Sequence, residues 1–347
     1  MSNLQIGLAV AGGVVLATLV GYNTWTSRKN APRRAAPDET SAEYDGLNAV
    51  EPSFADTDPQ APDMALPIPA RKPALDALID VLASLSLDLN TPVVSGDAAI
   101  AALPATRRAG TKPFAVEGFN ISTQQWEAPA AGQRYNSFQA GVQLANRTGA
   151  LNEIEYSEFV VKTQAFADAI GATPDFPEMR DEVARARELD QFASDHDAQL
   201  GFTIRARNAS WSPGYVQQNA ARLGFVAGAI AGRLVLPASQ DGMPPVLVLG
   251  FDSQAALAED PDQSAIREVS LYLDVAHAER AEQPFERMRD AAFTLAKGMD
   301  GVVTDDNGQP LAPETMDGIG SDLQILYNTL EQRDLAAGSA VARRLFS

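Results

Sequence analysis

The sequence predicts a mixed α+β protein behind an N-terminal transmembrane helix and a flexible tether, and three observations lead to this prediction. Residues 4–25 carry no charged side chain, and residues 29–73 are rich in proline, alanine and acidic residues. From residue 75 onward, strand-like and helix-like patterns follow one another in an order that occurs twice. We therefore expect two tandem units, each an antiparallel sheet covered by helices on one face.

The uncharged run at residues 4–25 is the expected membrane span. A helix of 22 residues is about 33 Å long, enough to cross a hydrocarbon core of roughly 30 Å. Four basic residues follow the run: Arg28, Lys29, Arg33 and Arg34. Basic residues beside a span stay on the cytoplasmic side, whereas a cleavable signal peptide carries them before its apolar run. We expect a short outside N-terminus and a cytoplasmic remainder.

Composition excludes several classes of function. The chain holds 27 basic and 45 acidic residues, and its net charge of −18 repels nucleic acid and anionic lipid at long range. It contains no cysteine, so disulfides, thiolate metal sites and cysteine nucleophiles are excluded. The two histidines, His196 and His277, lie in no zinc or triad motif. We expect no enzymatic activity, no cofactor, no metal, no nucleic acid and no small-molecule substrate.

The expected domain organisation has five parts. They are a transmembrane helix at 4–25, a flexible tether at 26–73, a diverged α/β unit at 75–195, a second unit at 197–335 and a tail at 336–347. The tether is expected because its prolines and charges leave too little apolar surface to bury. The C-terminal Arg343-Arg344-Leu345-Phe346 is expected to be a frayed end, with a docking tag as the alternative.

In the 75–195 segment, apolar residues alternate along positions 79–89, which predicts a strand. A short helix is expected at 97–108, interrupted at Pro104. Its other expected elements are strands at 113–119 and 137–145 and helices at 158–170 and 177–192. The sequence thus predicts strands first, and two helices near the end of this segment.

The 197–335 segment has the same order. We expect a strand at 200–207, a helix at 213–223, strands at 225–236, 245–251 and 268–276, a helix at 284–297, a hairpin at 302–311 and a helix at 313–330. Asp306-Asn307-Gly308 is a hairpin turn signal, and its spacing does not match a calcium loop. Residues 166–171 match residues 293–298 at an offset of 127, which favours a duplication, although coincidence between two α+β segments would also explain it.

Alternation in the 268–276 strand separates an inner from an outer face. The residues expected to point inward, under the helices, are Val269, Leu271, Leu273 and Val275. Tyr272 points outward, and Ile230 shares its side of a strand with two glycines. The equivalent outer positions of the first unit are polar: Glu117, Gln139, Gly141 and Gln143. An apolar open face implies a partner or a packed neighbour, and the first unit itself is one such neighbour.

Several landmarks of the second unit occur in a family-specific order. Residues 301–306 read Gly-Val-Val-Thr-Asp-Asp and precede Ala312-Pro313 at the start of the last helix. Residues 268–275 form the strand before the long helix, after Gly224-Phe225 and the apolar run at 245–249. In this order the segment resembles the FtsZ-binding C-terminal domain of the bacterial ZipA cell-division family. The single span and proline-bearing tether are similar to that family's layout.

The resemblance implies a peptide-binding role. In the family, the FtsZ C-terminal tail docks on the open hydrophobic sheet face. The positions that match its groove are Gly201, Thr203, Ile230, Leu249, Phe251 and Tyr272. The expected function is an adaptor that tethers FtsZ filaments to the bacterial inner membrane, with a periplasmic N-terminus and cytoplasmic domains. The alternative is a non-catalytic membrane-anchored structural protein whose two units pack together and bind another envelope or divisome component.

Overall fold

The computed structural model describes residues 32–35, 75–88, 92–305 and 307–347 of the chain. The predicted membrane span at residues 4–25 and most of the predicted tether lie outside these residues. No helix within the described part of the chain combines the length and the hydropathy that a bilayer crossing requires.

The described residues form two compact units, and each is discontinuous in sequence. Unit 1 contains residues 32–35 and 198–339, and unit 2 contains residues 75–197 and 340–347. Both units are mixed α+β structures with antiparallel sheets, as the sequence predicts.

Unit 1 is built on a six-stranded sheet in the order β11-β12-β13-β14-β10-β15, in which every neighbouring pair is antiparallel. Its strands are β10 (Gln199–Ala206), β11 (Val226–Ala227), β12 (Arg233–Leu236), β13 (Leu247–Gly250), β14 (Glu268–Asp274) and β15 (Gly301–Thr304). Its helices are α5 (Pro213–Ala221), α6 (Ser253–Ala256), α7 (Pro284–Met299) and α8 (Pro313–Glu331).

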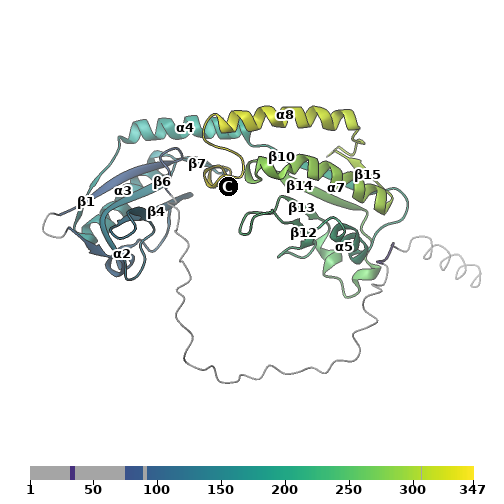
Figure 1. The fold of residues 1–347 in the computed structure, drawn as a ribbon, viewed down its shortest axis with the longest axis horizontal. Helices are drawn as coiled ribbons and strands as arrows, with labels where there is room; N and C mark the ends of the chain where they lie inside the picture. The colour runs from purple at the N-terminus through teal and green to yellow at the C-terminus, as the bar shows by residue number, and fades with distance from the viewer. Residues whose placement is uncertain (1–31, 36–74, 89–91, 306) are drawn as a thin grey trace, which may run out of the picture. The chain divides into compact units, whose positions relative to one another are not determined.

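Helices cover one face of the unit 1 sheet. α7 packs against β10, β14 and β15, and α8 packs against α7 (Figure 1). The α7 residues that enter the core recur every three or four positions, as one helix face requires: Phe285, Met288, Ala292, Leu295 and Met299. They meet the inward residues of the strands, so α7 leaves the opposite face of the sheet uncovered.

Unit 2 has a seven-stranded sheet with the path β3-β4-β6-β1-β9, in which β2 pairs with β6 and β5 pairs with β4. Its strands are β1 (Asp80–Leu87), β2 (Val94–Ser95), β3 (Arg108–Ala109), β4 (Lys112–Asn120), β5 (Gln125–Glu127), β6 (Arg134–Gln143), β9 (Ala172–Asp175) and, in a separate hairpin, β7 (Ala145–Asn146) and β8 (Gly149–Ala150). Its helices are α2 (Gly96–Ala102), α3 (Glu153–Ile170), α4 (Met179–His196) and α9 (Ala340–Leu345).

The two units share a topology, which supports the duplication. In each unit, the first long strand pairs on one side with the strand that precedes the long helix. On its other side it pairs with the short strand that follows the helix. β6-β1-β9 with α3 in unit 2 therefore corresponds to β14-β10-β15 with α7 in unit 1. The structural offset differs from that of the sequence match. Gly171 and Asp300 end the equivalent helices in left-handed conformations, with φ of 70° and 58°, and they are 129 positions apart rather than 127.

Two expected features of the sheets differ from the prediction. The strand expected at 225–236 is two short strands, β11 and β12, because a turn that includes Gly232 at φ 77° separates them. The outer face of unit 2 is polar but partly covered. Glu117 and Gln143 are buried, and the backbone N–H of Leu75 donates to Glu117 Oε1 over 3.2 Å.

The predicted tether is interrupted at residues 32–35, which we call the strap. Arg33 forms a parallel β-bridge with Trp211 of unit 1. Its backbone N–H donates to Ser210 O over 2.7 Å, and its carbonyl accepts from Ser212 N over 2.8 Å. The expectation of a free tether from 26 to 73 is therefore wrong for these residues, because backbone pairing with a distant segment has no signature in local composition.

The chain's C-terminus is not frayed, contrary to the expectation from sequence. Arg344 of α9 donates to both carboxylate oxygens of Asp80, over 2.9 and 2.6 Å, and Asp80 is fully buried. Leu345 and Phe346 are buried in unit 2, and the carbonyl of Arg344 accepts from Gln143 Nε2 over 2.7 Å. α9 thus completes unit 2, although the paired residues lie 264 positions apart.

We predict that Arg344→Ala strongly destabilises unit 2, because removal of one partner leaves the buried Asp80 carboxylate without its charge pair. The expected loss is about 3–5 kcal/mol of unfolding free energy. Hydrogen exchange of β1 and β6 amides, measured by mass spectrometry, should accelerate accordingly. Arg180→Ala removes an exposed arginine of α4 as the matched control. Equal exchange in both variants would show that the pair contributes nothing to unit 2.

We also predict that Tyr327→Phe removes an alkaline sensitivity from unit 1. The Tyr327 hydroxyl is buried without a hydrogen-bond partner among the described residues, and burial raises the pKa of Tyr327 to about 12. The unfolded phenol ionises near pH 10. Stability from the protonated phenol is therefore complete below pH 10 and is lost as the pH rises towards 12. Urea unfolding at pH 8 and pH 11 should give a smaller difference in the variant than in the parent.

Candidate peptide-binding groove

β14 presents two chemically different faces of the unit 1 sheet. Val269, Leu271 and Leu273 are fully buried under α7, as the alternation predicts. Tyr272 lies between them in sequence and points to the other face, where its side chain is 52% exposed. A large aromatic residue on the bare face of a sheet leaves apolar surface available to a partner.

The strand register places small and apolar residues around Tyr272. Val248 of β13 and Gly201 of β10 are its direct neighbours across the sheet. A Cβ built at Gly250 would lie 3.7 Å from the Tyr272 ring, in ordinary van der Waals contact. The two neighbouring glycines have no side chains to cover the tyrosine ring, which remains about half exposed.

A groove of about 660 Å³ lies on this face. Its lining joins the end of β13, the β11–β12 turn and β14. The apolar members are Ile230, Ala231, Phe251, Ala265, Ile266 and Tyr272. Four charged residues, two of each sign, also line it: Arg233, Asp252, Arg267 and Glu268. The groove thus combines an apolar floor with hydrogen-bonding groups of both charges, which is typical of a peptide site.

The structure brings together three of the six residues singled out in the sequence. Ile230, Phe251 and Tyr272 all line the groove. Ile230 reaches it from the β11–β12 turn rather than from a strand, and its side chain is 58% exposed. Gly201 and Thr203 lie on the same sheet face, since they pair with Tyr272 and Ser270, but they do not line the groove.

Leu249 is not on this face. It pairs with Leu234 and Leu271, and all three are buried in the core beneath the helices. The resemblance placed both Leu249 and Phe251 in the groove, and alternation along one strand would put them on the same face. β13 ends at Gly250, so the alternation does not continue to Phe251. Val248, on the open face, takes the place expected for Leu249.

Sequence reasoning also missed part of the groove. Ser270 and Ile266 line it, and the partly exposed Val248 extends its apolar face. Ser270 is two positions from Tyr272 on β14, so the same alternation places it on the outer face. Ile266 precedes the strand and joins the groove through its bridge to Trp211, which no local pattern indicates.

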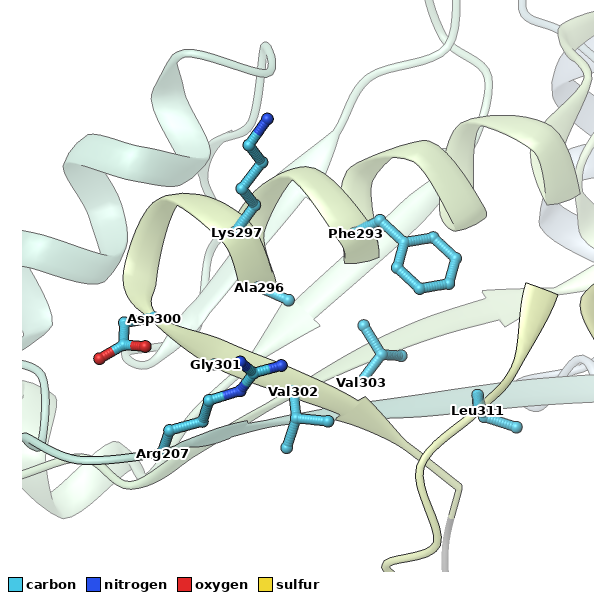
Figure 2. A pocket seen from close by; sticks show the side chains of 9 residues that line it. All are labelled: Arg207, Phe293, Ala296, Lys297, Asp300, Gly301, Val302, Val303 and Leu311. Atoms are coloured by element: carbon cyan, nitrogen blue, oxygen red, sulfur yellow. The ribbon is translucent and has the colours of Figure 1, made fainter.

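A second hollow, of about 440 Å³, lies where β15 leaves the C-terminal end of α7 (Figure 2). We call it the basic hollow, and its lining consists of Arg207, Phe293, Ala296, Lys297, Asp300, Gly301, Val302, Val303 and Leu311. Asp300 is held by two donors, Arg33 Nη2 over 3.0 Å and Asn208 Nδ2 over 3.1 Å. Its charge is therefore compensated, whereas Arg207 and Lys297 are exposed.

Neither groove nor hollow contains a histidine, and among the described residues no group of three or more metal-binding side chains could hold a metal ion. The predicted hairpin turn is confirmed. Asp305 Oδ1 accepts from the backbone N–H groups of Asn307 and Gln309, over 3.0 and 2.8 Å.

Comparison with known families addresses unit 1. Residues 257–321 match the family described as ZipA, C-terminal FtsZ-binding domain. This stretch of unit 1 is therefore similar to the C-terminal FtsZ-binding domain of ZipA. The match spans β14, α7, β15 and part of α8, and so includes Tyr272, whereas Ile230 and Phe251 precede it.

Other comparisons add nothing to this assignment. The sequence matches no curated protein. Among solved structures, berberine bridge enzyme from Eschscholzia californica aligns with 10% sequence identity over 77% of this chain and 54% of that enzyme, with a TM-score of 0.15. The chain thus spans about half the length of that enzyme.

We predict unequal effects on stability for two adjacent substitutions in β13 of unit 1. Leu249→Ala should destabilise unit 1 by about 2–5 kcal/mol, because it opens a cavity in the core. Val248→Ala, on the open face, should change the stability much less. Urea unfolding followed by far-UV circular dichroism measures both. A smaller loss for Leu249→Ala than for Val248→Ala would reverse the assignment of the two faces.

Proposed function

We propose that this protein is a non-enzymatic cell-division adaptor that captures the C-terminal tail of FtsZ on the open sheet face of unit 1. The observation that carries the proposal is the exposed Tyr272 beside Ile230 in the groove, on a strand that belongs to the ZipA match. The match to the ZipA domain at residues 257–321 and the accessible groove on the sheet face opposite α7 support the same function.

The proposed mechanism is burial of apolar tail side chains against Ile230, Phe251 and Tyr272. Burial of one large apolar side chain contributes roughly 1.5–3 kcal/mol. After the entropy lost on association, one tail should bind with a dissociation constant on the order of micromolar. The charged residues at the groove margin, Arg233 and Glu268 among them, offer a donor and an acceptor to orient the peptide.

The proposal includes attachment to the bacterial inner membrane through residues 4–25, with the described units in the cytoplasm. Many anchored copies would face many tails along one filament. A weak single contact then becomes a durable attachment through avidity, while each contact still exchanges rapidly. This combination suits a filament that must assemble and disassemble.

We predict that Ile230→Ala and Tyr272→Ala each weaken tail binding about five- to tenfold, because side chains that anchor an interface contribute more than about 1 kcal/mol. Fluorescence anisotropy of a labelled FtsZ C-terminal peptide from the same organism, titrated with the full chain in nanodiscs, gives the dissociation constant. The matched control is Ile325→Ala on α8, whose isoleucine is 65% exposed but lies outside the groove.

The full chain is required for this titration, because the strap belongs to unit 1 and α9 belongs to unit 2. Saturable binding that Ile325→Ala leaves unchanged and both groove variants weaken would establish the function. Binding that neither groove variant alters would remove this groove as the tail site, and no binding by the parent would refute the adaptor function.

A further inference from the structure

The strap limits how far unit 1 can lie from the predicted membrane span. Besides the two backbone hydrogen bonds of Arg33, its guanidinium contacts Asp300 Oδ2 over 3.0 Å and donates to Met299 O over 3.4 Å. The segment that pairs with the strap is anchored in the core of unit 1, because Trp211 is fully buried and its Nε1 donates to the same Met299 carbonyl over 2.7 Å. Four contacts thus hold one membrane-proximal residue on unit 1.

The length of chain before the strap limits the distance from the membrane. Arg33 follows Trp25, the last residue of the predicted span, by eight positions. An extended chain reaches at most about 3.6 Å per residue, so the strap lies within about 29 Å of the end of the span. Residues 36–74 then connect the strap to unit 2, rather than the membrane to unit 1.

The charges beside the strap differ from those of the chain as a whole. In a chain of net charge −18, Arg34, Arg207 and Lys297 are exposed around the strap and the basic hollow. Phe293, an exposed aromatic side chain on the same hollow, lies one helical turn before Lys297 (Figure 2). Basic residues beside an exposed aromatic suit an interface of anionic lipid head groups and acyl chains.

We propose that unit 1 lies directly on an anionic membrane surface, which the strap and the basic hollow face together. The bound lipid class is a phospholipid with a negative head group. The proposal rests on the membrane attachment in the proposed function but does not require FtsZ binding.

This placement also brings the groove close to the bilayer. Trp211 bridges Arg33 on one side and Ile266 on the other, and Ile266 lines the groove. Two strand spacings of about 4.8 Å therefore separate the strap from the edge of the groove. A tail captured there is captured at the membrane surface.

A single fluorophore can test the placement, because the chain contains no cysteine. Thr294→Cys places a label on the exposed side of α7 beside Phe293. The labelled full chain is incorporated into nanodiscs of phosphatidylcholine alone or with phosphatidylglycerol, each with head-group nitroxide lipid. Quenching should be strong with phosphatidylglycerol and weak without it.

Asp300→Gly distinguishes membrane binding that depends on the strap from a purely electrostatic attraction to anionic lipid. Asp300 has φ of 58°, which glycine adopts freely, so the substitution removes the Arg33 partner without backbone strain. It also makes the surface more positive, which would strengthen a purely electrostatic attraction. We expect it to abolish most of the quenching instead. Asp334→Gly, with the same charge change at a φ of 56° elsewhere in unit 1, is the matched control and should preserve it.

The proposal is overturned if quenching is equal in both lipid compositions, if Asp300→Gly leaves it intact, or if Asp334→Gly lowers it as much. Arg33→Gln, which leaves the α7 terminus unchanged, must reproduce the loss if the strap is its cause. The Tyr272→Ala variant distinguishes this proposal from the adaptor function, because it should lose affinity for the tail and keep its full quenching.

Discussion

The alternation of β14 is the constraint on which the candidate site depends. Val269, Leu271 and Leu273 must enter the core under α7, and their burial leaves Tyr272 no position except the opposite face. A register shift by one residue would bury the tyrosine and expose three aliphatic side chains. Core packing therefore holds the exposed aromatic residue in place, and the groove needs no interactions of its own to position it.

The same periodicity explains how much the sequence could predict. Alternation and helical spacing located most strands and helices, separated the faces of β14, and indicated the shared topology of the two units. They failed where a strand ended. β13 stops at Gly250, so Leu249 belongs to the core and Phe251 enters the groove from beyond the strand. The β11–β12 turn likewise carries Ile230 into the groove, because a glycine at positive φ divides what reads as one strand.

Contacts between the chain's ends and its interior had no sequence signal at all. Arg33 meets Asp300 across 267 positions, and Arg344 meets Asp80 across 264. Local periodicity reports only neighbours within a few residues, so the composition of both segments indicated a tether and a frayed end. In each case an arginine pairs with a carboxylate on a distant element. Asp300 lies at the left-handed end of α7, and Asp80 lies at the start of β1. Such pairs become visible only once the tertiary structure places the acid.

The strap changes how weak tail binding would act at a membrane. A head on a tether of some fifty residues samples a large volume, so the effective concentration of its groove near any one filament is low. A head held eight residues from the proposed span would sample a thin layer instead. Confinement to that layer raises the local groove concentration without any new contact to the peptide. A micromolar site would then recruit filaments efficiently, and release of the strap would weaken recruitment while the groove itself stayed intact.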